Sequence, residues 1–318
     1  MMRRPVGTGS RPKRASRIPI SGFIWVGFLV ASLLLMYIDP VIWAIGVTAS
    51  AAILALVLSS SGPPWHPSID RRDLIAVALF YGGVVGLFRV AFVVFTPDRP
   101  VGFWLTVGAG MLLGVVGPIS QQVGGRRRGL SSLGITRHHL AEALTLGLIL
   151  AIAQFGAMIW GHQFGELVDW MPLLAFSLVV GFFEVFFFRG FIQTRLEASL
   201  GTGPSVAGAA VLYAIYHLGY GVGPEELWLL FGLGLVYAVA YRLVENIFVL
   251  WPVVTPLNLF FNVEAIDIDL PWSSMVTIAA IGVTMIAATL WAHRHIKRRY
   301  ASLVPAPSPG TSPFDESD

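Results

Sequence analysis

Two residues that can carry charge lie in the most apolar stretch of this sequence. Glu184 and Arg189 occur within "GFFEVFFFRGFIQTR", residues 181–195, where most of the neighbours are Phe, Val, Ile or Gly. A carboxylate that is removed from water holds a proton more readily and becomes a usable general base near neutral pH. Together with an imidazole, such a group can activate a water molecule to attack a carbonyl carbon.

The elements that position these residues are expected to be membrane-spanning helices. Of the 318 residues, 55% are hydrophobic and only 12% are charged, about half the charged fraction of ordinary soluble domains. Apolar runs of about eighteen or more residues recur along the chain, and each is long enough to cross a bilayer core as a helix. The lack of cysteine excludes disulfides, thiolate nucleophiles and cysteine metal sites. The sequence therefore predicts an all-α polytopic membrane protein.

Hydropathy and the polar connectors predict about ten transmembrane helices, with both termini cytoplasmic. The expected spans lie near 20–38, 41–60, 74–97, 101–119, 140–160, 172–195, 205–220, 226–243, 246–263 and 272–293. Arg89 and Arg189 lie within spans and Arg99 on the opposite side, whereas the rest of the 21 Lys and Arg residues fall on the cytoplasmic side. We therefore interpret the basic residues as topology signals and expect no nucleic-acid partner.

Three polar residues are expected at one depth in the membrane. Counted from the cytoplasmic end of its span, Glu184 is eleven residues in, and His217 and Asn258 are each twelve residues in. At about 1.5 Å per residue, all three lie roughly 16–18 Å from the cytoplasmic face. In an α-helix Arg189 would point roughly 140° away from Glu184 and lie nearer the cytoplasm. This position suits a residue that steers a substrate or orients a loop.

Two interpretations of this polar level stay open. In the first, Glu184 pairs with Arg189 or His217, and the buried cluster only holds helices together. In the second, Glu184 and His217 hold a water molecule between them for attack on a carbonyl. His217 alone cannot hold a metal ion, so we expect neither a metal nor another cofactor. Arg89, within the third span, either pairs with a polar partner or lines a cavity.

At these residues the sequence resembles the CPBP family, which includes CAAX prenyl endopeptidases and bacteriocin-processing or self-immunity membrane proteins. The family's first motif is Glu-Glu-x-x-x-Arg, and here it reads "EVFFFRG", with Glu184 and Arg189 in place and Val185 at the second Glu. Its second motif, an aromatic residue, three others and a His, matches "YAIYH" from Tyr213 to His217. The resemblance covers roughly residues 140–263 and identifies a divergent member of the family.

The family's third motif, His-x-x-x-Asn, matches "LWPVVTPLNLFFN" in two registers. One register keeps Asn258 as the Asn and places Val254 at the histidine position. The other places Asn258 at the histidine position and keeps Asn262 as the Asn. We prefer the second register, because it retains a polar side chain at both positions.

The resemblance implies a division of labour among these residues. Glu184 and His217 would activate water, and Asn258 and Asn262 would hold the developing oxyanion. Arg189 and Tyr213 would position substrate or structure. Loss of one oxyanion donor typically lowers a rate about 100- to 1,000-fold, but an Asn amide at the histidine position still offers a donor.

The leading hypothesis is an intramembrane endopeptidase that resembles CAAX prenyl proteases and acts on a membrane-associated peptide or protein. The alternative is a catalytically impaired protein of the same fold that acts in binding, immunity or assembly, for which Val185 and the missing third-motif His argue. A transporter is a weaker alternative, because no internal repeat is evident. The expected location is the plasma (inner) membrane, with the lipid bilayer as a partner.

The order of segments predicts a regional organisation of the chain. The regions are a basic disordered cytoplasmic tail (1–19), N-terminal membrane helices without an assigned role (20–120), a basic cytoplasmic connector (121–139), a protease-like core with the last helix (140–293), and a basic, then disordered, C-terminal tail (294–318).

Overall fold

The computed structural model describes residues 69–95, 100–126, 128–137, 140–159 and 167–264. This part of the chain is helical and contains no strand, which agrees with the predicted all-α class. The elements are α3 (Arg71–Val94), α4 (Pro100–Met111), η1 (Leu112–Val116), α5 (Gly117–Ile119), η2 (Ser120–Gly125), η3 (Leu130–Leu133), α6 (Leu140–Ile159), α7 (Leu167–Glu184), η4 (Val185–Gln193), α8 (Thr194–Leu200), α9 (Thr202–Tyr216), η5 (His217–Tyr220), η6 (Pro224–Glu226), α10 (Leu227–Val244) and α11 (Ile247–Glu264).

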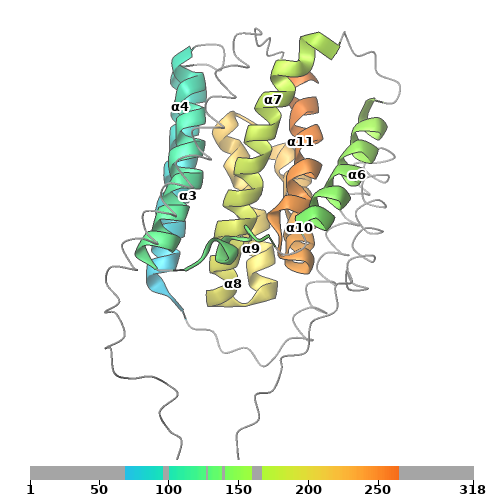
Figure 1. Ribbon diagram of the computed structural model, residues 1–318. Helices are drawn as coiled ribbons and strands as arrows, with labels where there is room; N and C mark the ends of the chain where they lie inside the picture. Colours follow the sequence, from blue (N-terminus) through green and yellow to red (C-terminus); the bar gives the residue numbers. More distant parts are fainter. Residues whose placement is uncertain (1–68, 96–99, 127, 138–139, 160–166, 265–318) are drawn as a thin grey trace, which may run out of the picture.

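These helices form a bundle around α7 and its continuation (Figure 1). On one side α3 packs along α4, and on the other side α6 packs against α11. Helices α9 and α10 also lie together, and Gly234 allows this contact, because a Cβ there would lie 3.0 Å from the Cα of Ala210. The long element α7–η4–α8 contacts both halves of the bundle and carries the apolar stretch with Glu184 and Arg189.

The outer surface of the bundle is apolar, as a membrane protein requires. Large hydrophobic side chains such as Leu79, Leu112 and Ile152 are exposed. Three helices are long and apolar enough to cross a membrane, namely Arg71–Val94, Trp104–Gly125 and Trp170–Leu200. Shorter apolar helices occupy Leu140–Ile152, Leu227–Arg242 and Ile247–Pro256. The chain is therefore a membrane protein.

The predicted spans between residues 74 and 263 each coincide with helix, although their ends differ by several residues. The helix that begins at Pro100 does not end near residue 119, because η1, α5 and η2 continue it to Gly125. The first residues of the predicted cytoplasmic connector (121–139) therefore belong to this helix. The predicted spans at 20–38, 41–60 and 272–293, and both tails, lie outside the described residues.

The core is built from aromatic side chains of the central helix. Phe186, Phe187, Phe188 and Phe191 are fully buried. The ring of Phe188 lies edge-on to that of Tyr216, with 4.9 Å between the ring centroids. This dense packing fixes the orientation of η4 relative to α9, and hence of the polar groups that the two elements carry.

Candidate active site

Glu184, the last residue of α7, meets Asn258 of α11 inside the bundle. The Nδ2 atom of Asn258 donates a hydrogen bond of 3.3 Å to Oε2 of Glu184. The two helices approach closely one turn earlier, because a Cβ at Gly181 would lie 3.1 Å from Oγ1 of Thr255. A hydrogen bond of 2.8 Å from Nε1 of Trp251 to the carbonyl of Leu178 adds a further link.

The Glu184 carboxyl group is almost completely removed from solvent, with 4% of the residue exposed. Four groups from three elements act on it electrostatically: the amide of Asn258 on α11, the guanidinium of Arg189 on η4, and the phenols of Tyr213 and Tyr216 on α9. Each of these can donate a hydrogen bond. Glu184 is therefore surrounded by donors, which is the environment that a buried acid or base requires.

The helix changes type directly after Glu184, and this change corrects the expected direction of Arg189. Residues Val185–Gln193 form a π-helix, which pairs residues i and i+5 rather than i and i+4. Arg189 is therefore the i+5 neighbour of Glu184 and lies on the same side of the helix, not about 140° away. Because the 140° expectation assumed α-helical geometry, it was wrong for this segment.

Arg189 is fully enclosed, with 1% of the residue exposed. Its guanidinium carbon lies 5.4 Å from the centroid of the Tyr213 ring, within the range of a cation–π contact. Its two terminal nitrogens form no hydrogen bond within the described residues. Val185, which replaces the second Glu of the motif, is also buried and offers no acceptor. The sequence predicted a positioning or structural role for Arg189 and Tyr213, and their contact is compatible with either.

His217 follows the last residue of α9 and has a defined tautomer. Its Nδ1 atom lies 2.8 Å from the carbonyl oxygen of Tyr213. Because a carbonyl oxygen only accepts hydrogen bonds, Nδ1 carries the proton, and Nε2 of the neutral ring is left as an acceptor. The Nε2 atom can therefore take a proton from water or from an acid.

Glu184 and His217 are linked through tyrosines rather than directly. The His217 ring lies 4.8 Å from the Tyr213 ring and 4.9 Å from the Tyr216 ring, centroid to centroid. The same two tyrosines act on Glu184. No hydrogen bond or ion pair joins Glu184 to His217 in the part of the chain that the structure describes. The predicted water-filled space between the two side chains stays a prediction.

The third-motif residues lie on α11 within three turns of one another. Val254 is buried among apolar residues, whereas Asn258 contacts Glu184. Asn262 lies four residues after Asn258 in the same helix, hence on the same face, although its side chain lies outside the described part. Both registers of the third motif contain Asn258, so its contact with Glu184 does not distinguish them. The choice between the registers stays a prediction.

Sequence reasoning missed several tyrosines that surround the carboxyl and imidazole groups. Tyr216 and Tyr220 contact the His217 ring, and their hydroxyl groups are hydrogen-bonded to each other. The spacing of Tyr213, Tyr216 and Tyr220 at positions i, i+3 and i+7 places them on one helical face, a signal that was available in the sequence. Tyr237 of α10 acts electrostatically on Arg189, and no comparable pattern marks it.

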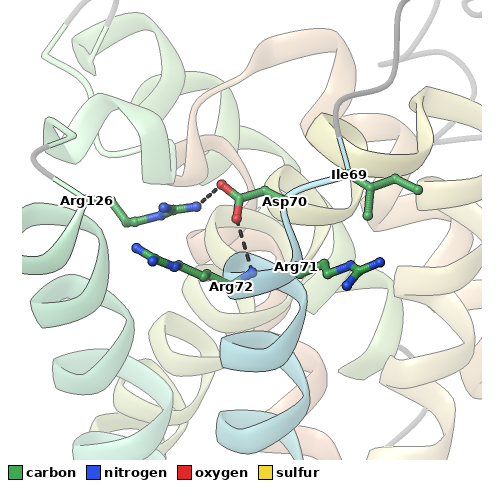
Figure 2. A pocket seen from close by; sticks show the side chains of 5 residues that line it. All are labelled: Ile69, Asp70, Arg71, Arg72 and Arg126. Atoms are coloured by element: carbon green, nitrogen blue, oxygen red, sulfur yellow. Dashed lines mark hydrogen bonds and ion pairs between the residues drawn. The ribbon is translucent and has the colours of Figure 1, made fainter.

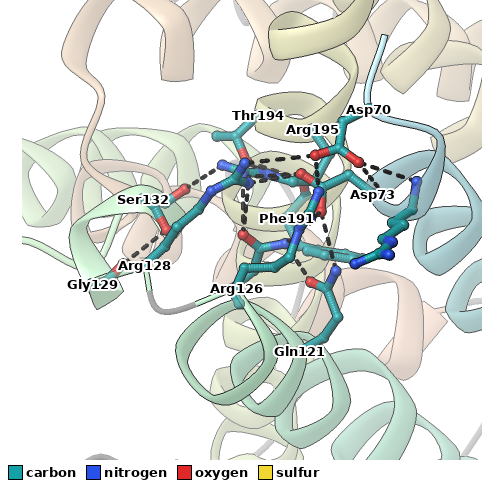
Figure 3. Close-up of polar contacts among 12 residues, drawn as sticks. Asp70, Asp73, Gln121, Arg126, Arg128, Gly129, Ser132, Phe191, Thr194 and Arg195 are labelled. Atoms are coloured by element: carbon teal, nitrogen blue, oxygen red, sulfur yellow. Dashed lines mark hydrogen bonds and ion pairs between the residues drawn. The ribbon is translucent and has the colours of Figure 1, made fainter. Parts of the chain in front are cut away.

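A second polar cluster, which the sequence analysis did not predict, lies where α3, η2 and α8 meet (Figure 3). Asp73 is fully buried and forms ion pairs with three arginines. The N–O distances are 3.0 Å to Arg126, 2.7 Å to Arg128 and 3.6 Å to Arg195. Arg195 also donates to the carbonyl of Ser132 at 3.0 Å. This cluster connects the N-terminal helices to the helix that carries Glu184.

No group of three or more His, Cys, Asp or Glu side chains is placed to hold a metal ion among the residues described. The carboxyl group of Glu184 and the imidazole of His217 can take part in acid–base and hydrogen-bond chemistry.

Comparison with known families gives one match. Residues 166–260 match the type II CAAX prenyl endopeptidase Rce1-like family. The match supports the resemblance to the CPBP family, and it contains Glu184, Arg189, Tyr213, His217 and Asn258. Asn262 and all of α3–α6 lie outside the matched segment. Searches of the curated proteins and of the solved structures returned no match.

The Rce1-like family is a family of membrane proteases, and the segment that matches it is α7 to α11. The match therefore favours CAAX-type intramembrane protease activity over the transporter alternative.

Proposed function

We propose that this protein is an intramembrane endopeptidase of the Rce1-like type, which hydrolyses a peptide bond in a membrane-associated peptide or protein. The observation that carries the proposal is the hydrogen bond between Asn258 and Glu184 within the matched segment. It joins a buried carboxyl group and an amide donor from separate helices at the depth where the sequence also places His217.

The proposed reaction uses Glu184 and His217 to activate water. Glu184, as general base, takes a proton from the water molecule while the hydroxide attacks the carbonyl carbon, and His217 is its partner through Nε2. The proton then passes to the leaving amine when the carbon–nitrogen bond breaks. An Asn amide carries two N–H donors, so Asn258 can hold Glu184 with one and the developing oxyanion with the other. Asn262 is the second proposed donor, and Arg189 and Tyr213 position the substrate or the site itself.

The proposal includes a membrane arrangement. About ten helices would cross the plasma (inner) membrane with both termini in the cytoplasm, in agreement with the distribution of Lys and Arg. Residues 140–293 would form the protease core and last helix, and 20–120 the additional N-terminal helices. The reaction would require no cofactor and no nucleic-acid partner.

The test is cleavage of a membrane-anchored peptide library by the purified protein in proteoliposomes. We expect Glu184→Ala and the isosteric Glu184→Gln to abolish cleavage, because neither can accept a proton from water. Glu226→Ala, at an exposed glutamate outside the site, is the matched control and should cleave at the wild-type rate. Cleavage by Glu184→Gln at the wild-type rate would overturn the proposal.

Two observations favour a second candidate function, a non-catalytic binding, immunity or assembly protein. Val185 is buried where the family has its second Glu, and the terminal nitrogens of Arg189 have no hydrogen-bond partner within the described residues. In that case Glu184→Ala would leave the cellular phenotype intact, whereas a packing change at Gly190 would remove it. The two variants therefore distinguish the candidates in cells.

A further inference from the structure

A shallow hollow at the start of α3 is lined by three arginines. Arg71 and Arg72 come from the first turn of α3, and Arg126 follows η2. Ile69 and Asp70 complete the lining (Figure 2). The hollow is therefore formed by two elements that are far apart in the sequence, and its charge is positive.

The single carboxylate of the hollow is already engaged. Oδ1 of Asp70 accepts hydrogen bonds from the backbone N–H groups of Arg72 and Asp73, at 3.1 and 3.4 Å, and caps α3. Its Oδ2 is ion-paired with Arg126. In contrast, the side chains of Arg71 and Arg72 form no hydrogen bond or ion pair with any residue that the structure describes. Figure 2 shows the Arg72 side chain extending to the same side of α3 as that of Arg126. The Arg71 side chain extends to the other side of α3, so the guanidinium groups that favour an anion between them are those of Arg72 and Arg126.

The surface beyond the arginines is apolar and exposed. Ile75 and Leu79 follow Arg72 at i+3 and i+7 and therefore lie along the same face of α3. They are 58% and 69% exposed. The opposite face of α3 carries the buried residues Val77, Val84 and Phe88, so the exposed stripe faces away from the protein core. Because α3 is long and apolar enough to cross a membrane, an exposed apolar stripe on it is suited to contact lipid chains.

We propose that the hollow at Arg71, Arg72 and Arg126 binds the phosphate of an anionic phospholipid, whose acyl chain lies along Ile75 and Leu79. The combination of a basic hollow at the end of a membrane helix and an apolar stripe that continues from it matches a headgroup and its chain. A free phosphate would use only the arginines. The sequence distribution of Lys and Arg places this end of α3 on the cytoplasmic side, where anionic lipids are attracted to basic residues.

The experiment compares lipid retention by the full-length protein. Purified protein is equilibrated with mixed micelles that contain equal amounts of phosphatidylglycerol and phosphatidylcholine, and bound lipid is counted by native mass spectrometry. We expect phosphatidylglycerol to be preferred, and the preference to fall about fivefold for Arg72→Gln and further for the double variant Arg71→Gln/Arg72→Gln. Arg137→Gln is the matched control. Arg137 is an exposed arginine of the predicted connector (121–139) but does not line the hollow, so this variant should retain the wild-type preference.

Two further arms separate the sources of the anion. Excess inorganic phosphate should not displace the lipid, because it lacks the acyl chain. Leu79→Ser should weaken lipid retention, because it removes an apolar contact and leaves Arg71 and Arg72 unchanged. Displacement by inorganic phosphate, or equal retention by the double variant and the wild type, would overturn the proposal. Arg71 and Arg72 are exposed at the surface, so the unfolding temperature of their variants should equal that of the wild type. A change in lipid retention then reports binding rather than folding.

Discussion

Asn258 donates a hydrogen bond of 3.3 Å to Glu184 from a position 74 residues further along the chain. The donor lies on α11 and the acceptor ends α7, so this contact depends on the packing of the two helices at Gly181. It holds the carboxyl group at one place in the buried interior of the bundle. The contact would orient Glu184 in its proposed role as general base before the substrate binds.

Asn258→Ala should lower the rate of peptide cleavage about 100- to 1,000-fold, because it removes a donor to Glu184 and to the proposed oxyanion. Single-turnover cleavage in proteoliposomes measures the effect. Asn262→Ala distinguishes the two registers of the third motif. A loss of similar size supports the register in which Asn258 and Asn262 form the pair, whereas an unchanged rate for Asn262→Ala supports the register of Val254 and Asn258.

Gly190→Ala should destabilise the protein by about 1–3 kcal/mol, because the added methyl group cannot be accommodated. A Cβ at Gly190 would lie 2.5 Å from the backbone carbonyl oxygen of Leu133. Backbone atoms move less readily than the end of a side chain. The thermal unfolding midpoint in detergent measures the change.

Gly86→Ala is the matched control for this glycine. Apart from the backbone of its own helix and its chain neighbours, no described atom lies within 4 Å of a Cβ at that position. Ala also favours helix more than Gly does. The control should therefore keep or raise the unfolding midpoint. If Gly190→Ala unfolds at the same temperature as Gly86→Ala, then η3 and η4 can move apart to accommodate a methyl group, and the prediction is wrong.

Arg89 binds the turn that carries His217. Its NH1 atom donates a hydrogen bond of 3.2 Å to the carbonyl oxygen of Leu218. Of the two alternatives expected for Arg89, the structure therefore shows the one with a polar partner. A cation at the C-terminal end of a helix also interacts favourably with the helix dipole. Arg89→Leu should therefore lower stability by about 1 kcal/mol, and Arg89→Lys should lose less because it keeps the charge. Equal unfolding midpoints for Arg89→Leu and the wild type would show that this contact contributes nothing.

The sequence predicts helices at the described spans and a shared level for Glu184 and Asn258, but not how the central helix is wound. Counting residues at the α-helical rise predicted that Glu184 and Asn258 share a level, and the structure places them in contact. The same α-helical geometry gave the wrong direction for Arg189, because nothing in "VFFFRGFIQ" indicates that it forms a π-helix. That choice depends on how four phenylalanine rings pack against neighbouring helices, which a local pattern does not contain.

The ion pairs of Asp73 escaped prediction for a different reason. The basic residues of the predicted connector were interpreted only as topology signals. Their acidic partner lies about fifty residues away in sequence, and local spacing gives no sign of the pairing. Long-range ion pairs of this kind follow from the packing of the helices that carry them.

Asp73→Asn should cost about 3–5 kcal/mol of stability, chiefly because it leaves the buried guanidinium of Arg195 without its carboxylate. The partly exposed Arg126 and Arg128 lose the same partner. Asp70→Asn is the matched control. Asp70 is partly exposed, and Asn still caps the helix, so only a partly exposed ion pair worth about 0–1 kcal/mol is lost. Thermal unfolding in detergent should therefore show a much larger fall for Asp73→Asn than for Asp70→Asn. Equal falls would mean that the cluster does not fasten α3 to α8. In that case the N-terminal helices are held to the protease-like segment mainly by apolar packing, such as that of Phe88 against Tyr216.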